Sequence, residues 1–227
     1  MKIAILGTGP VAKTLAGKLA SLSHDVVLGT RDPSATMARK EPDTFGLPPV
    51  AQWRKDNPSV GLATFASAVV AAEIVINASA GAAGLGALEA AGAANLGGKI
   101  VIDLSNPLDF SRGMPPSLTV CNDDSLGEQI QRAFPGAKVV KTLNTVNAFL
   151  MINPGQLAGA DHTMFVAGND ARAKEAVTGY LKDWFGWKDV MDLGDISNAR
   201  GTEMLLPLWA RVYVAGNNPM FAFKVVR

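Results

Sequence analysis

A glycine-containing turn near the N-terminus constrains the fold of this chain more than any other feature. Residues 2–6 (KIAIL) predict a short buried strand, and residues 11–22 place leucines at helical spacing. The turn between them reads Gly7-Thr8-Gly9-Pro10-Val11-Ala12, which fits the pattern G-x-G-x-x-A. Gly7 permits a tight turn, Gly9 lets a pyrophosphate approach the backbone, and Ala12 allows close packing of helix on strand. The sequence therefore predicts a dinucleotide-binding turn at the start of a helix.

The remainder of the chain alternates short apolar runs with helical patterns. Further strands are predicted at residues 25–28, 74–77, 99–104, 138–143, 162–166 and 190–193. Helices are predicted at residues 34–40, 63–72, 84–94, 126–134, 171–184 and 197–214, the last kinked or divided by Pro207. Prolines between residues 41 and 60 predict an irregular loop. This alternation predicts an α/β fold of the Rossmann type, with a doubly wound, mainly parallel sheet. We expect one domain over residues 1–227, with a small C-terminal helical appendage at about 195–227.

The end of the second predicted strand favours NADP(H) over NAD(H). NAD sites usually place Asp or Glu there for the ribose 2′-hydroxyl, whereas NADP sites use Arg for the 2′-phosphate. This strand ends in Gly29-Thr30-Arg31, and Asp32 is expected to begin the next helix. Arg31 can grip a phosphate through two hydrogen bonds, and Thr30 and Ser34 can add hydroxyl donors. The alternative is that Arg31 is a solvated loop residue.

Three other predicted strands end in loops of small and polar residues, and ligands bind at the carboxyl ends of strands in such sheets. We expect these loops to converge around a reactive ring. Their candidate residues are Asn77, Ala78, Ser79, Asn106, Pro107, Asn144 and Thr145. Alternatively, any one of them serves its own loop backbone. No Ser/His/Asp arrangement is recognisable, Lys141 lies inside a predicted strand, and no catalytic residue is assigned. Hydride transfer between two ring cofactors needs positioning and no protein acid or base, so that reaction is favoured over carbonyl reduction.

Composition narrows the partners. One cysteine, Cys121, excludes an intramolecular disulfide and a cysteine-based zinc site, and two histidines disfavour a histidine metal site, so no metal is assigned. The net charge of +1 gives no bulk attraction to nucleic acid or to an anionic membrane. The chain lacks a signal-peptide pattern and a continuous apolar span of about 20 residues, so a cytoplasmic location is expected.

The chain resembles the NADPH-dependent coenzyme F-420 reductases, also called F-420-dependent NADP oxidoreductases, over its whole length. The matching segments are KIAILGTGPVAKTLA, VVLGTRDP, VIDLSNPL, VVKTLNTVNA, MFVAGNDARAK, LGDISNARGTEMLLPLWA and FAFKVVR. The resemblance implies a compact Rossmann fold with a deazaflavin stacked on the nicotinamide. It implies NADP(H) contacts from Gly7, Thr8, Gly9, Pro10, Val11, Thr30, Arg31 and Ser34. It also implies a reaction pocket with Asn77, Ala78, Asn106, Pro107, Asn144 and Thr145. Related domains of membrane ferric reductases pass electrons to a flavin. Residues 77–86 depart from the family in having few bulky side chains, which leaves the acceptor open.

The expected function is hydride transfer between NADPH and a small redox acceptor, either F-420 or a flavin. Two alternatives stay open. A reductase of a small imine or carbonyl would need a larger helical domain than the roughly thirty residues after Gly194, or helices shared in a dimer. A redox sensor would bind NADP(H) without turnover. The apolar helix at residues 197–214 either covers the chain's own sheet or forms a homodimer interface with the aromatics of residues 220–223.

Overall fold

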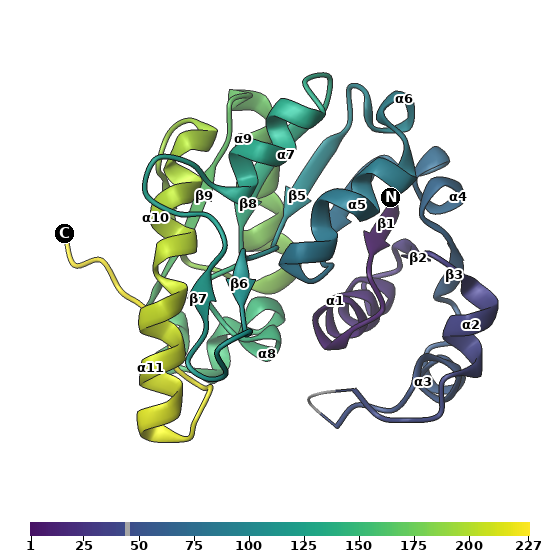
Figure 1. Ribbon diagram of the computed structural model, residues 1–227, viewed down its shortest axis with the longest axis horizontal. Coiled ribbons are helices and arrows are strands. Elements are labelled where there is room, and N and C mark those ends of the chain that lie inside the picture. Colours follow the sequence, from purple (N-terminus) through teal and green to yellow (C-terminus); the bar gives the residue numbers. More distant parts are fainter. Residues whose placement is uncertain (44–45) are drawn as a thin grey trace.

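Figure 1 shows the computed structural model, which describes residues 1–43 and 46–227. The described residues form one eight-stranded sheet in the order β10-β9-β8-β5-β4-β1-β2-β3. Its strands are β1 Lys2–Leu6, β2 Asp25–Thr30, β3 Gly61–Thr64, β4 Ile74–Asn77, β5 Ile100–Asp103, β8 Lys138–Thr142, β9 Thr163–Ala167 and β10 Asp189–Asp192. All neighbouring strands pair in parallel except β8 and β9, which are antiparallel. The predicted doubly wound, mainly parallel sheet is confirmed.

Helices cover both faces of the sheet (Figure 1). The helices are α1 Pro10–Ser21, α2 Pro33–Ala38, α3 Val50–Asp56, α4 Phe65–Val70, α5 Gly81–Ala91, α6 Ala93–Leu96, α7 Leu126–Ala133, α8 Ala148–Ile152, α9 Ala171–Tyr180, α10 Ala199–Met204 and α11 Leu206–Gly216. A short hairpin of β6 Leu108–Asp109 and β7 Ser117–Leu118 lies apart from the main sheet. A π-helical turn, Leu181–Phe185, continues α9.

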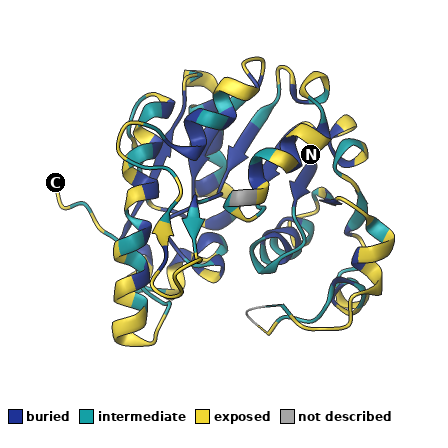
Figure 2. Cartoon of the chain, in the orientation of Figure 1, coloured by how far each residue is buried: buried dark blue, intermediate teal, exposed yellow. Residues whose placement is uncertain are grey.

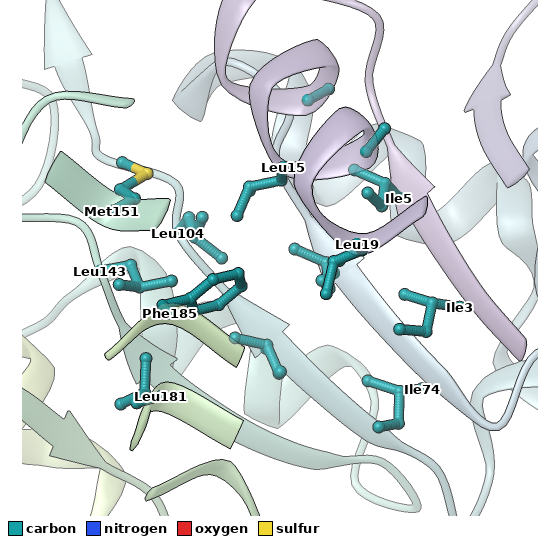
Figure 3. Packing of buried hydrophobic residues seen from close by; sticks show 14 of the residues in the cluster. Ile3, Ile5, Leu15, Leu19, Ile74, Leu104, Leu143, Met151, Leu181 and Phe185 are labelled. Carbon is teal, nitrogen blue, oxygen red and sulfur yellow. The ribbon is translucent and has the colours of Figure 1, made fainter. Parts of the chain in front are cut away.

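Alternate residues of the strands supply two apolar clusters, one on each face of the sheet. On the first face, Leu15 and Leu19 of α1 pack with Ile3 and Ile5 of β1, and Figure 3 shows this packing. On the second face, α4, α5 and α7 cover a cluster that contains Ala4, Leu6, Val75, Val101 and Val139. Figure 2 shows that the central strands of the main sheet are buried while α11 and the β6–β7 hairpin have exposed surfaces. Because helices cover both faces, the sheet can present ligand-binding groups only where its strands end.

The prediction of an irregular loop over residues 41–60 is wrong for its second half, because residues 50–56 form α3. Pro49 occupies the N-cap position, so the prolines bound this helix instead of preventing it. Val50 and Trp53, three residues apart, are buried and supply the apolar contact that stabilises the helix. Residues 44–45 lie outside the described residues.

A helix was predicted from residue 63, but α4 begins two residues later, at Phe65, because residues 61–64 form strand β3. The Thr64 side chain caps α4 by accepting a hydrogen bond from the Ser67 N–H at 3.2 Å. β3 is the outermost strand and is only partly buried, so it lacks the apolar run by which buried strands are predicted. The helix predicted at 84–94 begins earlier, at Gly81, and is interrupted at Gly92, whose φ is +91°.

The C-terminal region is helical, as predicted, and is divided into α10 and α11. Pro207 lies in the first turn of α11, where a missing N–H is tolerated. The final segment then runs beside β9, where the Thr163 N–H donates to the Phe223 carbonyl at 3.0 Å. Within the part of the chain that the structure describes, no helix has the length and apolar character needed to cross a membrane.

Candidate functional site

The turn between β1 and α1 has the geometry that its glycines predicted. Gly7 has a φ of +122°, and a Cβ at this position would lie 2.8 Å from the Ala78 carbonyl oxygen, so only glycine fits without strain. Gly9 is the N-cap of α1, and a Cβ there would meet no atom within 4 Å. Among residues 1–43 and 46–227, no side chain caps α1, and the first turn of this helix contains no acidic residue. The first N–H groups of α1 therefore have no capping side chain within the described part of the chain and can bind an anion.

A hollow of about 360 Å³ opens beside this turn. Thr8 and Gly9 line one wall, Lys13, Arg39 and Lys40 add cationic groups, and Glu41 and Asp43 add carboxylates. The Lys13 side chain is buried, lies 2.7 Å from the Asp43 carboxylate and donates to the Pro48 carbonyl at 2.6 Å. Lysine and arginine around an uncapped helix N-terminus suit the phosphates of a dinucleotide.

The end of β2 carries no carboxylate. Asp32 accepts a hydrogen bond from the Ala35 N–H at 3.0 Å and caps α2, as expected. Arg31 and Ser34 are exposed. Thr30 is buried, and its hydroxyl lies 2.8 Å from the Thr36 hydroxyl. Arg31 and Ser34 are therefore accessible to a ligand, whereas the Thr30 hydroxyl already has a partner within the protein.

Polar residues replace apolar ones at the carboxyl ends of three central strands. Asn77 of β4 pairs in register with Asp103 of β5, which pairs with Lys141 of β8. Side chains two residues apart share a face of a sheet, so these three continue the face of the second apolar cluster. The sequence prediction assigned only Asn77 to the site and noted Lys141 merely as a strand residue.

Asp103 and Lys141 form, together with Glu203 of α10, what we call the buried charge cluster. The Lys141 ammonium lies 2.8 Å from both the Asp103 and the Glu203 carboxylates, and it also donates to the Ser105 carbonyl. These three charged side chains are at most 2% exposed. Burial by itself lowers the pKa of Lys141, but the two carboxylates outweigh it and raise that pKa above its usual value. Lys141 therefore stays protonated.

Asp103 connects this cluster to the loops that follow the strands. Its Oδ1 accepts hydrogen bonds from the Asn77 amide at 2.8 Å and from the Ser105 hydroxyl at 2.7 Å. The Asn77 oxygen in turn accepts from the Ser79 hydroxyl at 2.5 Å. Asn77 is completely buried, and both ends of its amide bind protein groups. Its side chain therefore positions Ser79, which is partly exposed.

The third predicted loop joins the same region. The Asn144 amide donates to the Asn106 side-chain oxygen at 2.9 Å, and the Asn106 amide donates to the Asn144 carbonyl at 3.0 Å. A Cβ on Gly81 would lie 1.7 Å from the Asn106 carbonyl oxygen, so glycine lets α5 begin against this loop. Pro107 and Thr145 are buried, and Ala78 is partly buried. The three loops are linked by these hydrogen bonds, and their placement around a reactive ring stays a prediction.

The missed residues Asp103, Lys141 and Glu203 had a signal in the sequence. A lysine within an apolar strand must be paired when it is buried, which calls for carboxylates nearby. The strand KIVIDL ends in one and the apolar helix TEMLLPLW contains the other. Among the described residues, no group of three or more His, Cys, Asp or Glu side chains could hold a metal ion.

An α/β sheet with a glycine turn of this geometry defines a protein of the Rossmann type. Residues 2–107 match the family model described as NADP oxidoreductase, coenzyme F420-dependent. A crystal structure from Arthrobacter sp. FB24, provisionally assigned as an F420-dependent NADP reductase, is 57% identical, with 100% of each chain covered and a TM-score of 0.94. The chain belongs to this family of NADP-dependent oxidoreductases, as its resemblance implied.

Two more distant proteins are also similar. Metalloreductase STEAP3 of Rattus norvegicus is 28% identical over 212 residues, which are 92% of this chain. This chain spans only 38% of the length of that curated relative. An imine reductase of Streptomyces aurantiacus is 17% identical with a TM-score of 0.61, over 95% of this chain and 64% of the reductase. That second likeness is one of fold alone.

Proposed function

We propose that this chain transfers hydride between NADPH and a deazaflavin (F-420) or flavin-type acceptor. The observation that carries the NADP(H) part is the open, uncapped turn at Gly9 next to a β2 end that exposes Arg31 and holds no carboxylate. An acidic residue there would repel a 2′-phosphate, whereas a guanidinium binds it. Family membership supports the same cofactor.

Each part of the site has a separate task in this proposal. The backbone at Gly9 and the first turn of α1 bind the pyrophosphate, and Arg31 with Ser34 binds the 2′-phosphate. The loops that contain Ser79, Asn106 and Thr145 hold the reacting rings and keep water out. When bound, NADPH supplies the hydride at its nicotinamide.

A ring-to-ring transfer agrees with the chemistry of the side chains present. Asp103 and Lys141 are fully buried and bind each other, so neither offers a proton to a substrate. Hydride transfer from one ring to another needs alignment and no protein acid. The small residues after β4, Ala78 to Ala80, leave room for a planar acceptor. The family description names coenzyme F420, which makes a deazaflavin the first acceptor to test.

Substitution of Arg31 by glutamate tests the cofactor assignment. Loss of charge-assisted hydrogen bonds should weaken NADPH binding by at least about tenfold and leave NADH binding nearly unchanged. Both dissociation constants can be measured by fluorescence titration. Arg172→Glu on the exposed surface of α9 makes the same charge change away from the site and serves as the control. An unaltered NADPH dissociation constant in Arg31→Glu would refute the 2′-phosphate contact.

The acceptor is tested by mixing protein and NADPH with F-420, FMN, FAD, a ferric chelate and a cyclic imine. Loss of nicotinamide absorbance with F-420 or a flavin is the expected result. Oxidation with the imine alone would favour the small-substrate reductase. Tight NADPH binding without oxidation by any acceptor would favour a sensor.

We further propose that residues 1–227 form one domain that pairs as a homodimer through α11. Leu206 and Ala210 of this helix are buried against the chain's own structure, so one side of the helix does cover the protein. Leu208 and Val212 of this helix are 50% and 40% exposed, and Met204 at the end of α10 is 39% exposed. The four-residue spacing places Leu208 and Val212 on one face of α11, and a second copy of that face would cover it. A cytoplasmic location stays a prediction from the sequence.

A further inference from the structure

The buried charge cluster connects the C-terminal helix α10 to the strand ends at the candidate site. Glu203 belongs to α10, whereas its partner Lys141 belongs to β8. All three ammonium hydrogens of Lys141 have an acceptor, in Asp103, Glu203 and the Ser105 carbonyl. A lysine with three fixed acceptors holds them at fixed distances from each other. The C-terminal helix α10 therefore supplies a carboxylate, that of Glu203, to the carboxyl ends of the central strands.

The charges of this cluster are balanced by helix α7. Two carboxylates and one ammonium leave a net charge of −1, and the Glu203 carboxylate faces the first turn of α7. Glu203 accepts from the Leu126 N–H at 2.8 Å and from the Gly127 N–H at 3.0 Å. A Cβ on Gly127 would lie 2.9 Å from the Ala199 Cβ, so glycine allows α10 this close approach. With every charge partnered, the cluster is suited to hold a position and not to exchange protons.

The fixed position of Asp103 in the cluster also fixes, through hydrogen bonds, the loops that would surround the reacting rings. Asp103 holds Asn77 and Ser105, and Asn77 holds Ser79. The strand-end amides lie in the same region, with the Ala78 N–H donating to the Leu6 carbonyl at 3.0 Å and the Leu104 N–H to the Asn77 carbonyl at 3.1 Å. The turn at Gly9 takes no part in these hydrogen bonds.

We propose that the buried charge cluster is a positioning device, through which α10 fixes the loops after β4 and β5 for hydride transfer. Its residues act through Ser79 and Ser105 and do not themselves touch a ligand. The effect on the reaction rests on the proposed function, whereas the mechanical link between α10 and the loops does not. Because the hydrogen bonds of the cluster reach Ser79 and Ser105 and not Gly9 or α1, disturbing the cluster should reduce kcat much more than NADPH affinity.

Glu203→Gln is the variant of choice, because it keeps the size of the side chain and removes the charge that holds Lys141. Its amide nitrogen also cannot accept a hydrogen bond from α7. Arg200→Met is the matched control. Arg200 lies on the same helix and binds Glu128 of α7 at 2.6 Å, so it too joins α10 to α7, but it does not reach Lys141. Lys141→Met is a more severe variant of the same cluster.

Amide hydrogen exchange tests the mechanical link without any acceptor. In Glu203→Gln, exchange at Ala78 and Leu104 should rise severalfold over wild type, whereas Arg200→Met should leave it unchanged. Lys141→Met should raise it further, and if that variant does not fold, Glu203→Gln still decides the question. If the Ala78 and Leu104 amides of Glu203→Gln exchange at the same rate as those of the wild type, the proposal is overturned. An equal rise in Arg200→Met would do so too, because it would reduce the role of Glu203 to helix docking.

Steady-state kinetics test the consequence for the reaction. With the acceptor that supports turnover, kcat of Glu203→Gln should fall about 10- to 100-fold, while the NADPH dissociation constant stays within about threefold. A loss confined to NADPH affinity would overturn the positioning role. If wild-type protein binds NADPH but oxidises it with no acceptor, the proposed function fails, and the exchange measurement still decides whether α10 holds the loops.

Discussion

Gly7 and Gly9 belong to one turn but have different surroundings, and this difference separates folding from binding. Alanine at Gly7 would have a φ of +122° and a Cβ 2.8 Å from the Ala78 carbonyl, so Gly7→Ala should cost about 1–3 kcal/mol of stability. Gly9 has a φ of −78° and open space, so Gly9→Ala should change stability by less than about 0.5 kcal/mol. Its methyl group would nevertheless lie where we propose that the pyrophosphate approaches, so NADPH affinity should fall.

Thermal unfolding and NADPH titration of the two variants check this expectation. The informative result is a normal melting temperature together with weak NADPH binding in Gly9→Ala. Normal binding in that variant would mean that no phosphate approaches the backbone at Gly9.

His162 predicts how stability depends on pH. It is 3% exposed, packs edge-on against Trp187 and has no hydrogen-bond partner among the described residues for either ring nitrogen. Burial lowers its pKa, although Asp161 opposes this. Since the folded state favours the neutral ring, this stabilisation is complete above the unfolded-state pKa of about 6.5 and is lost as the pH falls below it.

The melting temperature should therefore decrease from pH 7 to pH 5, and His162→Leu should make that decrease smaller. Melting curves of both proteins over this range provide the measurement. A variant with the same pH dependence as wild type would assign the acid sensitivity to other groups.

Single residues were predictable from the sequence where backbone geometry required a specific amino acid, and unpredictable where a distant partner decided their role. Gly7 is determined by its own φ and by the carbonyl that it faces. Lys141 gains its position from Glu203, which is 62 residues away in the chain and brought close only by folding. Likewise, nothing near Thr30 in the sequence indicates that Thr36 takes up its hydroxyl.

At the scale of elements, α7 illustrates a start signal that can be tested. Ser125, fully buried, is the N-cap of α7: its hydroxyl accepts from the Glu128 N–H at 3.1 Å and donates to the Glu128 carboxylate at 2.7 Å. Ser125→Ala should cost about 1–2 kcal/mol, at the upper end for an N-cap, because it also leaves Glu128 with one partner fewer. Urea unfolding followed by circular dichroism measures this cost.

The exposed cap of α4 supplies the comparison. Thr64→Ala removes a similar hydrogen bond where water can replace it, so its cost should be smaller, at about 0.5–1 kcal/mol. Equal costs for the two variants would argue against any special contribution from burial at Ser125.

Buried strands were predicted within one or two residues, whereas β3 at one edge of the sheet and the neighbouring α3 were missed. β1 and β4 are apolar runs covered on both faces, and such runs have few other interpretations. β3 and α3 lie at the other extreme, with half-exposed residues whose pattern does not distinguish them from a loop. The doubly wound, mainly parallel class of the sheet was predictable from the alternation of strands and helices, whereas the strand order was not predicted.

At the scale of the whole molecule, the assembly is the next property to measure. If α11 forms a homodimer, Leu208→Glu places a charge in the centre of the apolar face and should convert a dimer to a monomer. Light scattering at micromolar concentration reads out the mass. Arg211→Glu, an exposed change on the same helix, is the control for general loss of helix stability. A wild-type protein with monomeric mass would rule out the interface.

The direction of β9 could not be predicted, because an apolar run has no signal for direction. β9 runs against β8, and β10 follows β9 in parallel. The carboxyl ends of these two strands therefore lie at the edge away from Asn77 and Asn144. The C-terminal region must then return past β9, which brings Glu203 of α10 to the strand ends on the other edge.

Because β9 is reversed, the molecule has an exposed surface far from the candidate site where it could be attached to a support. Pro135, Gly136 and Asn169 are exposed and line a shallow hollow of about 460 Å³ at the edge opposite the candidate site. A cysteine introduced there could anchor the protein to an electrode or a bead with its dinucleotide turn facing the solution. Immobilised in that orientation, a redox protein of this kind would remain open to both of its small-molecule reactants.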